Sequence, residues 1–420
     1  MTSRERFIKT LNHQQPDKVV IDIGATSQTG INACPLYKLR EALGLEQKPV
    51  TIIEPAQILA KVDEDLVKAV GSDVIGLWGP QNVLGVRNDN YKPFTMPDGT
   101  PAKMPGGLKF SRDENGKYYT YPQGDDSVPP SMYMPNDGYF FDNIERAGDF
   151  DEDNLTPIED FKDDFSVMND ETAREIEKRS YELYDGTEYG IIGMFGGGSF
   201  GDVFLLPACS QKQAPKGIRK LEDWLMAHLL YPEYIKEIYT MQSEIILKNL
   251  EIYKQAVGNR VQALWLSGTD FGTQNAPFTS VETFCELYKP FQKNVNDWIH
   301  QNTNWKTFYH TCGAIRPLIP HMIEAGVDIL NPVQCSAVGM DAQQLKDDFG
   351  KDVVFWGGGI DTQKILPFGT PEEVHDQVLE RLSIFSKDGG YVFASIHNIV
   401  GNIPKENLLA MINAVKEYNS

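Results

Sequence analysis

The amino-acid sequence predicts an α/β protein folded as a (β/α)8 barrel, with a β-rich insertion after the second strand. Eight short apolar segments rich in strand-forming residues recur along the 420-residue chain, and each is followed by a helical pattern. One long polar stretch interrupts this alternation. No glycine-rich dinucleotide fingerprint follows the first strand, which disfavours a doubly wound sheet, the main alternative. We therefore expect one barrel domain over residues 1–420.

The order of the elements follows from their periodicity and from the Gly, Pro, Asp and Asn residues between them. Apolar runs rich in Val, Ile and aromatic residues predict strands at 18–23, 73–78, 189–194, 261–266, 305–310, 327–331, 353–356 and 391–395. Apolar residues at helical spacing predict helices at 4–13, 36–43, 63–70, 170–184, 220–257, 281–301, 314–325, 341–349, 371–387 and 404–418. At least one helix thus separates each strand from the next, as parallel neighbours in a barrel require.

Residues 80–188 form the interruption, where Pro, Gly, Asp and Tyr crowd together and turn signals recur. A Tyr-rich run at 118–121 lies between two such signals, and the helical pattern at 170–184 closes the stretch. These features predict an inserted subdomain of β-hairpins and a helix over the active-site side of the barrel. Its aromatic residues either line a pocket or only attach the insertion to the barrel, and the sequence leaves both readings open.

Charge and cysteine content exclude several classes of function. The chain carries 39 Lys and Arg against 59 Asp and Glu, a formal charge of −20, so binding to nucleic acid or to an anionic membrane is disfavoured. The sequence shows neither a signal-peptide pattern nor an apolar run long enough to span a membrane, and we expect a cytoplasmic protein. Five cysteines at irregular spacing do not form a disulfide pattern, so we expect reduced thiols.

The strongest chemical signal is the His-x-Cys motif formed by His310 and Cys312 at the end of the fifth predicted strand. Imidazole and thiolate are side chains that zinc prefers, and alternation in an extended segment places both on one face. A zinc site needs three or four ligands. His397, at the end of the eighth strand, is the first choice for the third ligand. Cys335 and Asp270 are the alternatives.

Other polar side chains also follow the predicted strands by a few residues, at the end of the barrel where active sites of this fold form. They are Asp270, Asn331, Gln334, Cys335, Asp361 and Asn398. Asp270 is a candidate catalytic residue that would orient a substrate or act as a fourth, displaceable metal ligand. The amides Asn331, Gln334 and Asn398 are candidates for hydrogen bonds to a substrate.

Several motifs resemble one known family. They are Arg4-Glu-Arg-Phe7 near the start, His310-Thr-Cys312-Gly313, Ala325-Gly-Val-Asp-Ile329, and the closing Gly389-Gly-Tyr-Val-Phe-Ala-Ser-Ile-His397 with Pro404-Glu-Asn. Together they resemble the uroporphyrinogen decarboxylase superfamily, and within it they are most similar to the corrinoid-dependent methyltransferase branch. The likeness covers both ends of the chain well and the insertion poorly.

That resemblance implies a (β/α)8 barrel with a zinc site built from a His-x-Cys pair and a later Cys. His310 and Cys312 match the first two positions, and His397 stands at the place of the later Cys, which gives a His/Cys/His set. The decarboxylases themselves hold the carboxylates of their substrate with an Arg-rich segment after the first strand. Residues 24–30 occupy that place here and contain no Arg. Asp73 resembles the pyrrole-binding Asp of the decarboxylases, so that activity stays open.

The motif and the resemblance together predict a zinc-dependent methyltransferase that moves a methyl group between a small substrate and a corrinoid carried by a partner protein. The aromatic-rich insertion favours a methoxylated aromatic donor, and a thiol acceptor is the other option. The corrinoid is assigned to a partner because the chain shows no cobalamin-binding motif, and a homodimer is also considered. The alternatives are a metal-free uroporphyrinogen-type decarboxylase with Asp73 as its key catalytic carboxylate, and a barrel that binds a ligand without turnover.

Overall fold

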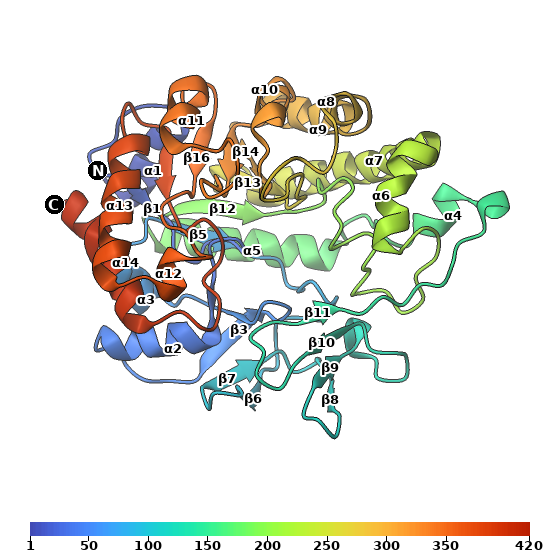
Figure 1. Cartoon of the computed structure of the whole chain (residues 1–420), viewed down its shortest axis with the longest axis horizontal. Coiled ribbons are helices and arrows are strands. Elements are labelled where there is room, and N and C mark those ends of the chain that lie inside the picture. The colour runs from blue at the N-terminus through green and yellow to red at the C-terminus, as the bar shows by residue number, and fades with distance from the viewer.

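Eight parallel strands form the central sheet of the computed structural model, which describes residues 1–420 (Figure 1). Their order around the sheet is β1-β17-β16-β15-β14-β13-β12-β5. The strands are β1 (Val20–Ile21), β5 (Val74–Leu77), β12 (Gly190–Met194), β13 (Ala263–Ser267), β14 (Lys306–His310), β15 (Ile329–Asn331), β16 (Val354–Trp356) and β17 (Tyr391–Phe393). All eight predicted barrel strands are present, and the sheet is a nearly closed barrel, as the sequence predicts.

The two end strands, β1 and β5, meet at a seam in place of a regular ladder. The Asp73 N–H donates to the Ile21 carbonyl oxygen at 2.7 Å, and the Ile21 N–H donates to Oδ2 of Asp73 at 3.0 Å. The Ile23 N–H donates to the Ser72 hydroxyl oxygen at 3.2 Å. Side chains just before β5 thus satisfy backbone groups of the first strand that an open sheet edge would leave unpaired.

The barrel interior is filled by its own cluster of 13 buried apolar residues. Helix α1 (Ser3–Leu11), which begins with a capping box, covers the amino-terminal end of the barrel. There Phe7 packs edge-on against Trp356 with 5.5 Å between ring centroids, and Phe308 meets the same indole at 5.1 Å. The interior is therefore a packed core, which leaves the carboxyl-terminal end of the barrel for a ligand site.

Helices connect the successive strands and form the outer layer, and most lie where the sequence predicts them (Figure 1). They are α2 (Ala33–Ala42), α3 (Glu64–Val70), α5 (Asp170–Gly186), α6 (Leu221–Leu230), α7 (Pro232–Val257), α9 (Lys289–Asn302), α10 (Ile319–Glu324), α11 (Ala342–Phe349), α13 (Pro371–Phe385) and α14 (Lys405–Tyr418). Helix α8 (Val281–Thr283) and a π-helical turn at Phe284–Tyr288 precede α9. Two short helices, α4 (Pro157–Phe161) and α12 (Ile365–Phe368), are too brief for periodicity to predict. None of the helices has the length and apolar character needed to cross a membrane.

Two smaller sheets accompany the barrel. The antiparallel sheet β11-β10-β9-β8 lies within residues 80–188, and the second sheet has the order β2-β4-β3-β7-β6. Their strands are β2 (Ile31–Asn32), β3 (Val50–Glu54), β4 (Leu59–Ala60), β6 (Lys92–Thr95), β7 (Pro101–Met104), β8 (Phe110–Arg112), β9 (Tyr118–Thr120), β10 (Met132–Met134) and β11 (Asp142–Asn143). Strand β7 pairs in parallel with β3, which precedes the second barrel strand. The expected separate insertion at 80–188 is therefore not confirmed, because chain from both sides of β5 builds one sheet.

The aromatic residues of this region pack on one another and on loops of the barrel. The Phe110 ring contacts the Phe94 and Phe141 rings, with centroids 5.5 and 6.0 Å apart. The Tyr139 carbonyl oxygen accepts a hydrogen bond from the Asn32 amide at 2.7 Å, and the Tyr139 ring lies against Gly401. These contacts attach the region to the barrel, which is one of the two readings that the sequence leaves open.

Candidate metal centre

Three side chains that the sequence singles out as zinc ligands come together at the carboxyl-terminal end of the barrel. His310 is the last residue of β14, Cys312 follows it by two residues, and His397 lies in the loop after β17. One ligand atom from each side chain lies within 4.8 Å of the other two. The two imidazole rings are 5.6 Å apart between centroids. After small side-chain adjustments, one metal ion can reach all three side chains.

The His310 imidazole is held in one orientation by its neighbour on the adjacent strand. Strands β14 and β15 run parallel with His310 opposite Asn331, and Nδ1 of His310 lies 2.5 Å from Oδ1 of Asn331. The Asn331 amide is itself fixed, because its Nδ2 donates to the Trp356 carbonyl oxygen at 2.8 Å. Since Oδ1 can only accept, Nδ1 carries the proton and Nε2 keeps a lone pair. That Nε2 atom lies 3.3 Å from Sγ of Cys312.

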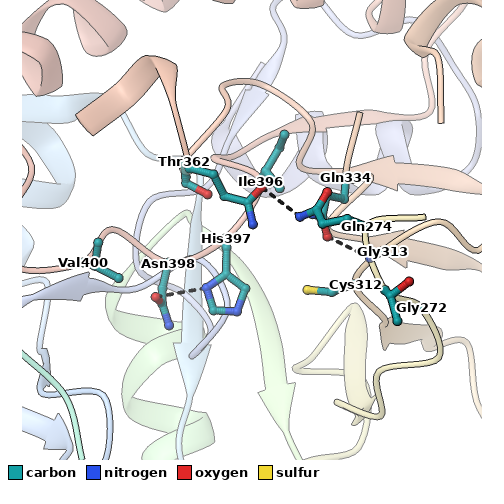
Figure 2. Close-up of a pocket in the computed structure, with 12 residues that line it drawn as sticks. Gly272, Gln274, Cys312, Gly313, Gln334, Thr362, Ile396, His397, Asn398 and Val400 are labelled. Atoms are coloured by element: carbon teal, nitrogen blue, oxygen red, sulfur yellow. Dashed lines mark hydrogen bonds between the residues drawn. The ribbon is translucent and has the colours of Figure 1, made fainter. Parts of the chain in front are cut away.

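The second histidine is held in the same way by a different asparagine. Nδ1 of His397 donates to Oδ1 of Asn398 at 3.1 Å, as Figure 2 shows by a dashed line. The Asn398 Nδ2 donates to the Ser27 carbonyl oxygen at 3.3 Å and also bonds the Gln57 side chain. A hydrogen bond to one ring nitrogen that leaves the other free is the usual support of a metal-binding histidine. Asn331 and Asn398, which the sequence offers as substrate-binding residues, thus orient the two imidazoles.

Asp270 is the carboxylate next to this group of side chains. It follows β13, and its Oδ1 accepts a hydrogen bond from the Cys312 N–H at 2.7 Å. The same oxygen lies 3.5 Å from Nε2 of His310. The carboxylate therefore holds the backbone at Cys312 and lies within reach of a metal ion bound beside it.

Burial and the neighbouring carboxylate set the protonation of this centre without a metal. Burial raises the pKa of the Cys312 thiol well above its usual value, and the Asp270 carboxylate raises it further. Burial also lowers the pKa of His397 to about 4, and the nearby His310 adds to that effect. A neutral thiol and a neutral imidazole are thus favoured at neutral pH. A cation bound between them would stabilise the thiolate, so metal binding would release the thiol proton.

A cavity of about 390 Å³ opens beside Cys312 and His397 (Figure 2). It is lined by Gly272, Thr273, Gln274, Cys312, Gly313, Gln334, Thr362, Gln363, Ile396, His397, Asn398 and Val400. Of the predicted substrate-binding residues, Gln334 and Asn398 line it. Its volume is that of a site for a small molecule. No aromatic residue of 80–188 belongs to the lining of this cavity.

The structure does not bring Asp73 to this centre. Asp73 lies at the amino-terminal end of β5, the opposite end of the barrel. Its Oδ1 accepts hydrogen bonds from the Ser3 hydroxyl at 2.6 Å and from Nη1 of Arg6 at 2.6 Å, while Oδ2 accepts the Ile21 N–H. Its carboxylate ties α1 to the seam between β1 and β5, and the catalytic role expected for Asp73 stays a prediction that this centre does not support.

Cys335, an alternative for the third ligand, also lies outside the group. It is in the loop after β15, and burial raises its pKa to about 11. All five cysteines of the chain are free thiols. The structure therefore groups the three side chains that the sequence ranks first as candidate ligands, with Asp270 beside them.

Sequence reasoning missed Gln274, Thr362 and Gln363, which line the cavity. Nε2 of Gln274 donates to Oε1 of Gln363 at 2.9 Å, which joins the loops after β13 and β16 across the cavity mouth. These residues follow the same two strands as Asp270 and Asp361, so their position could have signalled them. Their residue type could not, because glutamine and threonine are ordinary components of polar loops.

Comparison with known proteins places this centre in a family context. The family model described as uroporphyrinogen decarboxylase matches residues 215–418, which include all three grouped ligands. No curated protein sequence matches the chain. The resemblance to the uroporphyrinogen decarboxylase superfamily is thus confirmed over the carboxyl-terminal half of the chain.

Three solved structures align with the chain. A methyltransferase from Methanosarcina mazei aligns with 100% of both chains at 14% sequence identity and a TM-score of 0.55. A GH10 endoxylanase from a sugarcane soil metagenome aligns with 62% of this chain and 100% of its own at 10% identity and a TM-score of 0.32. The GH53 catalytic domain of Ignisphaera aggregans covers 94% of this chain and 99% of its own at 12% identity and a TM-score of 0.33. The first shows a shared fold, and the other two scores are too low to carry an argument.

Proposed function

We propose that this protein is a zinc-dependent methyltransferase that moves a methyl group between a small substrate and a corrinoid carried by a partner protein. The observation that carries the proposal is the convergence of His310, Cys312 and His397, with Nδ1 of each histidine engaged by an asparagine. Three protein ligands with an open fourth position are typical of catalytic zinc. The family match over residues 215–418 and the fold shared with a methyltransferase support this class of reaction.

The donor set fits zinc. Imidazole nitrogen and thiolate sulfur are the ligands that this ion prefers, and His310, Cys312 and His397 would hold it. When bound, zinc supplies Lewis-acid chemistry, either by keeping a substrate thiol as its thiolate or by polarising the oxygen of a methyl ether. Asp270, 3.5 Å from Nε2 of His310, would orient the substrate or act as a displaceable fourth ligand.

The chain's own residues would bind and orient the substrate in the cavity beside the metal ligands. For a methyl ether, the bond between the methyl carbon and the oxygen breaks, and its electron pair stays on the substrate oxygen, which takes a proton. The methyl group would leave without that pair, and the reduced corrinoid of the partner would supply the electron pair that accepts it. A methoxylated aromatic donor and a thiol acceptor are the two substrates that the sequence suggests.

A uroporphyrinogen-type decarboxylase is the rival within the same superfamily, and two observations disfavour it. The cavity lining contains no Lys or Arg to hold the carboxylates of a porphyrinogen. Asp73, the carboxylate that this alternative needs, lies at the other end of the barrel. A barrel that binds a ligand without turnover is separated from the proposal by an activity measurement.

Metal analysis of protein purified without added zinc tests the proposal. We expect about one equivalent of zinc in the wild-type protein, loss of most of it in His310→Ala, and none of that loss in His375→Ala, whose imidazole bonds Glu417 on the outer surface. Methyl transfer to a cobalamin-binding partner protein should be lost in parallel. Less than about half an equivalent of zinc, with no change in His310→Ala, would contradict the proposal. Coproporphyrin formation from uroporphyrinogen would favour the decarboxylase.

A further inference from the structure

We infer that the substrate of this site is an uncharged molecule whose oxygen accepts a hydrogen bond from the Gln334 amide, such as a small methyl ether or alcohol. This inference rests on the proposed function and names its substrate class. It favours such a molecule over a thiol or ether that carries a carboxylate, sulfonate or ammonium group.

The cavity lining contains no charged side chain. The lining residues include no Lys, Arg, Asp or Glu, and their polar groups are amides, hydroxyls, a thiol and one imidazole. An ionised group of a substrate enclosed there would lose hydration without gaining a counter-ion. With zinc bound, the Cys312 thiolate and the Asp270 carboxylate, which bonds the Cys312 N–H just beside the cavity, would together offset the two positive charges of the ion, so the site would offer neither an anion nor a cation a net counter-charge.

The Gln334 side chain is held in one orientation by a backbone hydrogen bond. Gln334 is only 6% exposed, although its side chain lines the cavity. Its Oε1 accepts a hydrogen bond from the Gly313 N–H at 2.7 Å (Figure 2). Because a backbone N–H can only donate, the amide orientation is fixed, and the NH₂ group is left without a protein acceptor. An NH₂ group that faces a cavity and has no protein acceptor is available to an acceptor oxygen of a ligand.

The other amides at the cavity have less to offer a ligand. Both hydrogens of the Asn398 amide are engaged by Ser27 and Gln57, and its oxygen accepts from His397. Gln274 and Gln363 bond each other at the exposed rim. Gln334 is therefore the amide of this cavity whose NH₂ group remains available to a ligand.

The same lining disfavours a cationic substrate. Ammonium and quaternary amines are recognised by carboxylates or by aromatic rings that surround the charge. The cavity contains neither, apart from the His397 imidazole that belongs to the metal ligands. An uncharged ligand with acceptor oxygens fits both the neutral lining and the free NH₂ group of Gln334.

Three methoxy compounds of nearly equal size separate the classes: 2-methoxyethanol is neutral, methoxyacetate is anionic and 2-methoxyethylammonium is cationic. Their dissociation constants are measured by ligand-observed NMR with the full-length wild-type protein, and zinc is quantified in the same samples. We expect 2-methoxyethanol to bind at least about tenfold more tightly than either ion, because an unpaired buried charge costs more than about 1.4 kcal/mol.

The variant Gln334→Glu tests the role of the amide. Glutamate keeps the acceptor for the Gly313 N–H and replaces the NH₂ donor by a carboxylate oxygen, so the backbone contact is preserved. We expect it to weaken 2-methoxyethanol binding about tenfold and to make 2-methoxyethylammonium the tightest of the three. The same substitution at Gln343, an exposed residue of α11, is the control and should change no constant more than about twofold.

The binding constants of the three probes support or overturn the inference as follows. Tightest binding of the neutral probe, reversed in Gln334→Glu and unchanged in Gln343→Glu, supports the inference. Tightest binding of methoxyacetate or of the ammonium compound by the wild-type protein, equal binding of all three, or binding of none overturns it. If zinc is present and the neutral preference is absent, only the inference fails. If the neutral preference is present and zinc is absent, the proposed function fails.

Discussion

The two ends of the barrel both contain buried ionisable side chains, but these are satisfied in opposite ways. At the amino-terminal end, Asp73 accepts hydrogen bonds from a hydroxyl, a guanidinium and a backbone N–H. At the carboxyl-terminal end, His310 and His397 use Nδ1 for asparagine partners and keep Nε2 free of a strong partner. A fully bonded carboxylate stabilises the fold, whereas a positioned lone pair is available to a ligand.

This difference shows that burial alone does not distinguish a functional side chain from a structural one. Asp73 and His310 are both less than one-tenth exposed. What separates them is the direction in which their free lone pairs point and whether a cavity lies there. The cavity opens beside Cys312 and His397 and lies at the end of the barrel opposite Asp73. Variants at the two ends should therefore affect different properties of the protein.

Removal of the Asp73 carboxylate should produce the largest loss of stability. Asp73→Ala leaves the Arg6 guanidinium, the Ser3 hydroxyl and the Ile21 N–H with fewer partners in a buried setting. We expect the free energy of unfolding, measured by chemical denaturation, to fall by about 3–5 kcal/mol, with zinc content per folded protein unchanged. The control is Asp17→Ala, because Asp17 pairs with the same Arg6 at a side chain that is 34% exposed. It should cost at most about 1 kcal/mol, and equal losses in both variants would contradict the comparison.

Removal of a candidate metal ligand should instead lower zinc binding and leave the stability of the metal-free protein almost unchanged. Cys312→Ala removes the only sulfur among the three grouped side chains. The binding free energy of zinc at a structural site with four ligands is roughly 10–16 kcal/mol, so one ligand contributes about 3 kcal/mol. Zinc affinity, measured by competition with a chelator, should fall more than about a hundredfold. Unfolding of the metal-free protein should change little. The matched control is Cys335→Ala, a buried thiol outside the group, and zinc loss there would indicate a different ligand set.

Asp22 is a fully bonded, structural carboxylate that lies near the carboxyl-terminal end of the barrel, so structural ionisable groups are not confined to the amino-terminal end. Its oxygens accept the Ala25 N–H and the Trp356 indole N–H, each at 2.9 Å. Burial raises its pKa from 3.8 to about 6. The folded state therefore retains a proton that the unfolded state releases at lower pH. The stability from this group is complete below pH 3.8 and is lost as the pH rises to about 6.

The measurement is the difference in unfolding free energy between wild type and Asp22→Leu as a function of pH. As the pH rises from about 4 to about 6, the wild type should lose up to about 3 kcal/mol of unfolding free energy relative to Asp22→Leu. Above that range the difference should stay constant. Taking the difference removes the parallel contribution of Asp202, whose pKa burial also raises to about 6. A difference that is independent of pH would show that Asp22 is ionised in the fold throughout.

The barrel could be predicted from sequence because its strands are local signals. The five-residue strand β14 is an apolar, aromatic run that ends in polar residues, and the other barrel strands repeat that form. The smaller sheet could not be predicted in the same way. Its parallel pairing of Val50 with Ala102 joins segments from the two sides of β5, and neither segment carries a mark of its partner. The separate insertion expected at 80–188 is not confirmed for that reason.

The candidate site shows the same division. His310 and Cys312 could be found because their types and spacing are those of zinc ligands, and His397 because it ends the eighth strand. The roles of Asn331 and Asn398 depend on strand register and loop packing, which the sequence does not display. Asp73 begins its predicted strand, whereas active sites of this fold lie at the carboxyl ends of strands, so the sequence itself carried a signal that Asp73 lies away from the other candidates.

The smallest expected effect concerns the asparagines that orient the histidines. Asn331→Ala removes the acceptor from Nδ1 of His310, so the ring can rotate and its tautomer is no longer fixed. Zinc affinity should fall about 10- to 100-fold, less than in Cys312→Ala, and Asn398→Ala should act similarly on His397. Asn331→Asp separates orientation from packing, since a carboxylate also accepts from Nδ1–H and should restore most of the affinity. If Asn331→Asp binds zinc as weakly as Asn331→Ala, the asparagine supports the centre through its bond to the Trp356 carbonyl oxygen and not through the histidine.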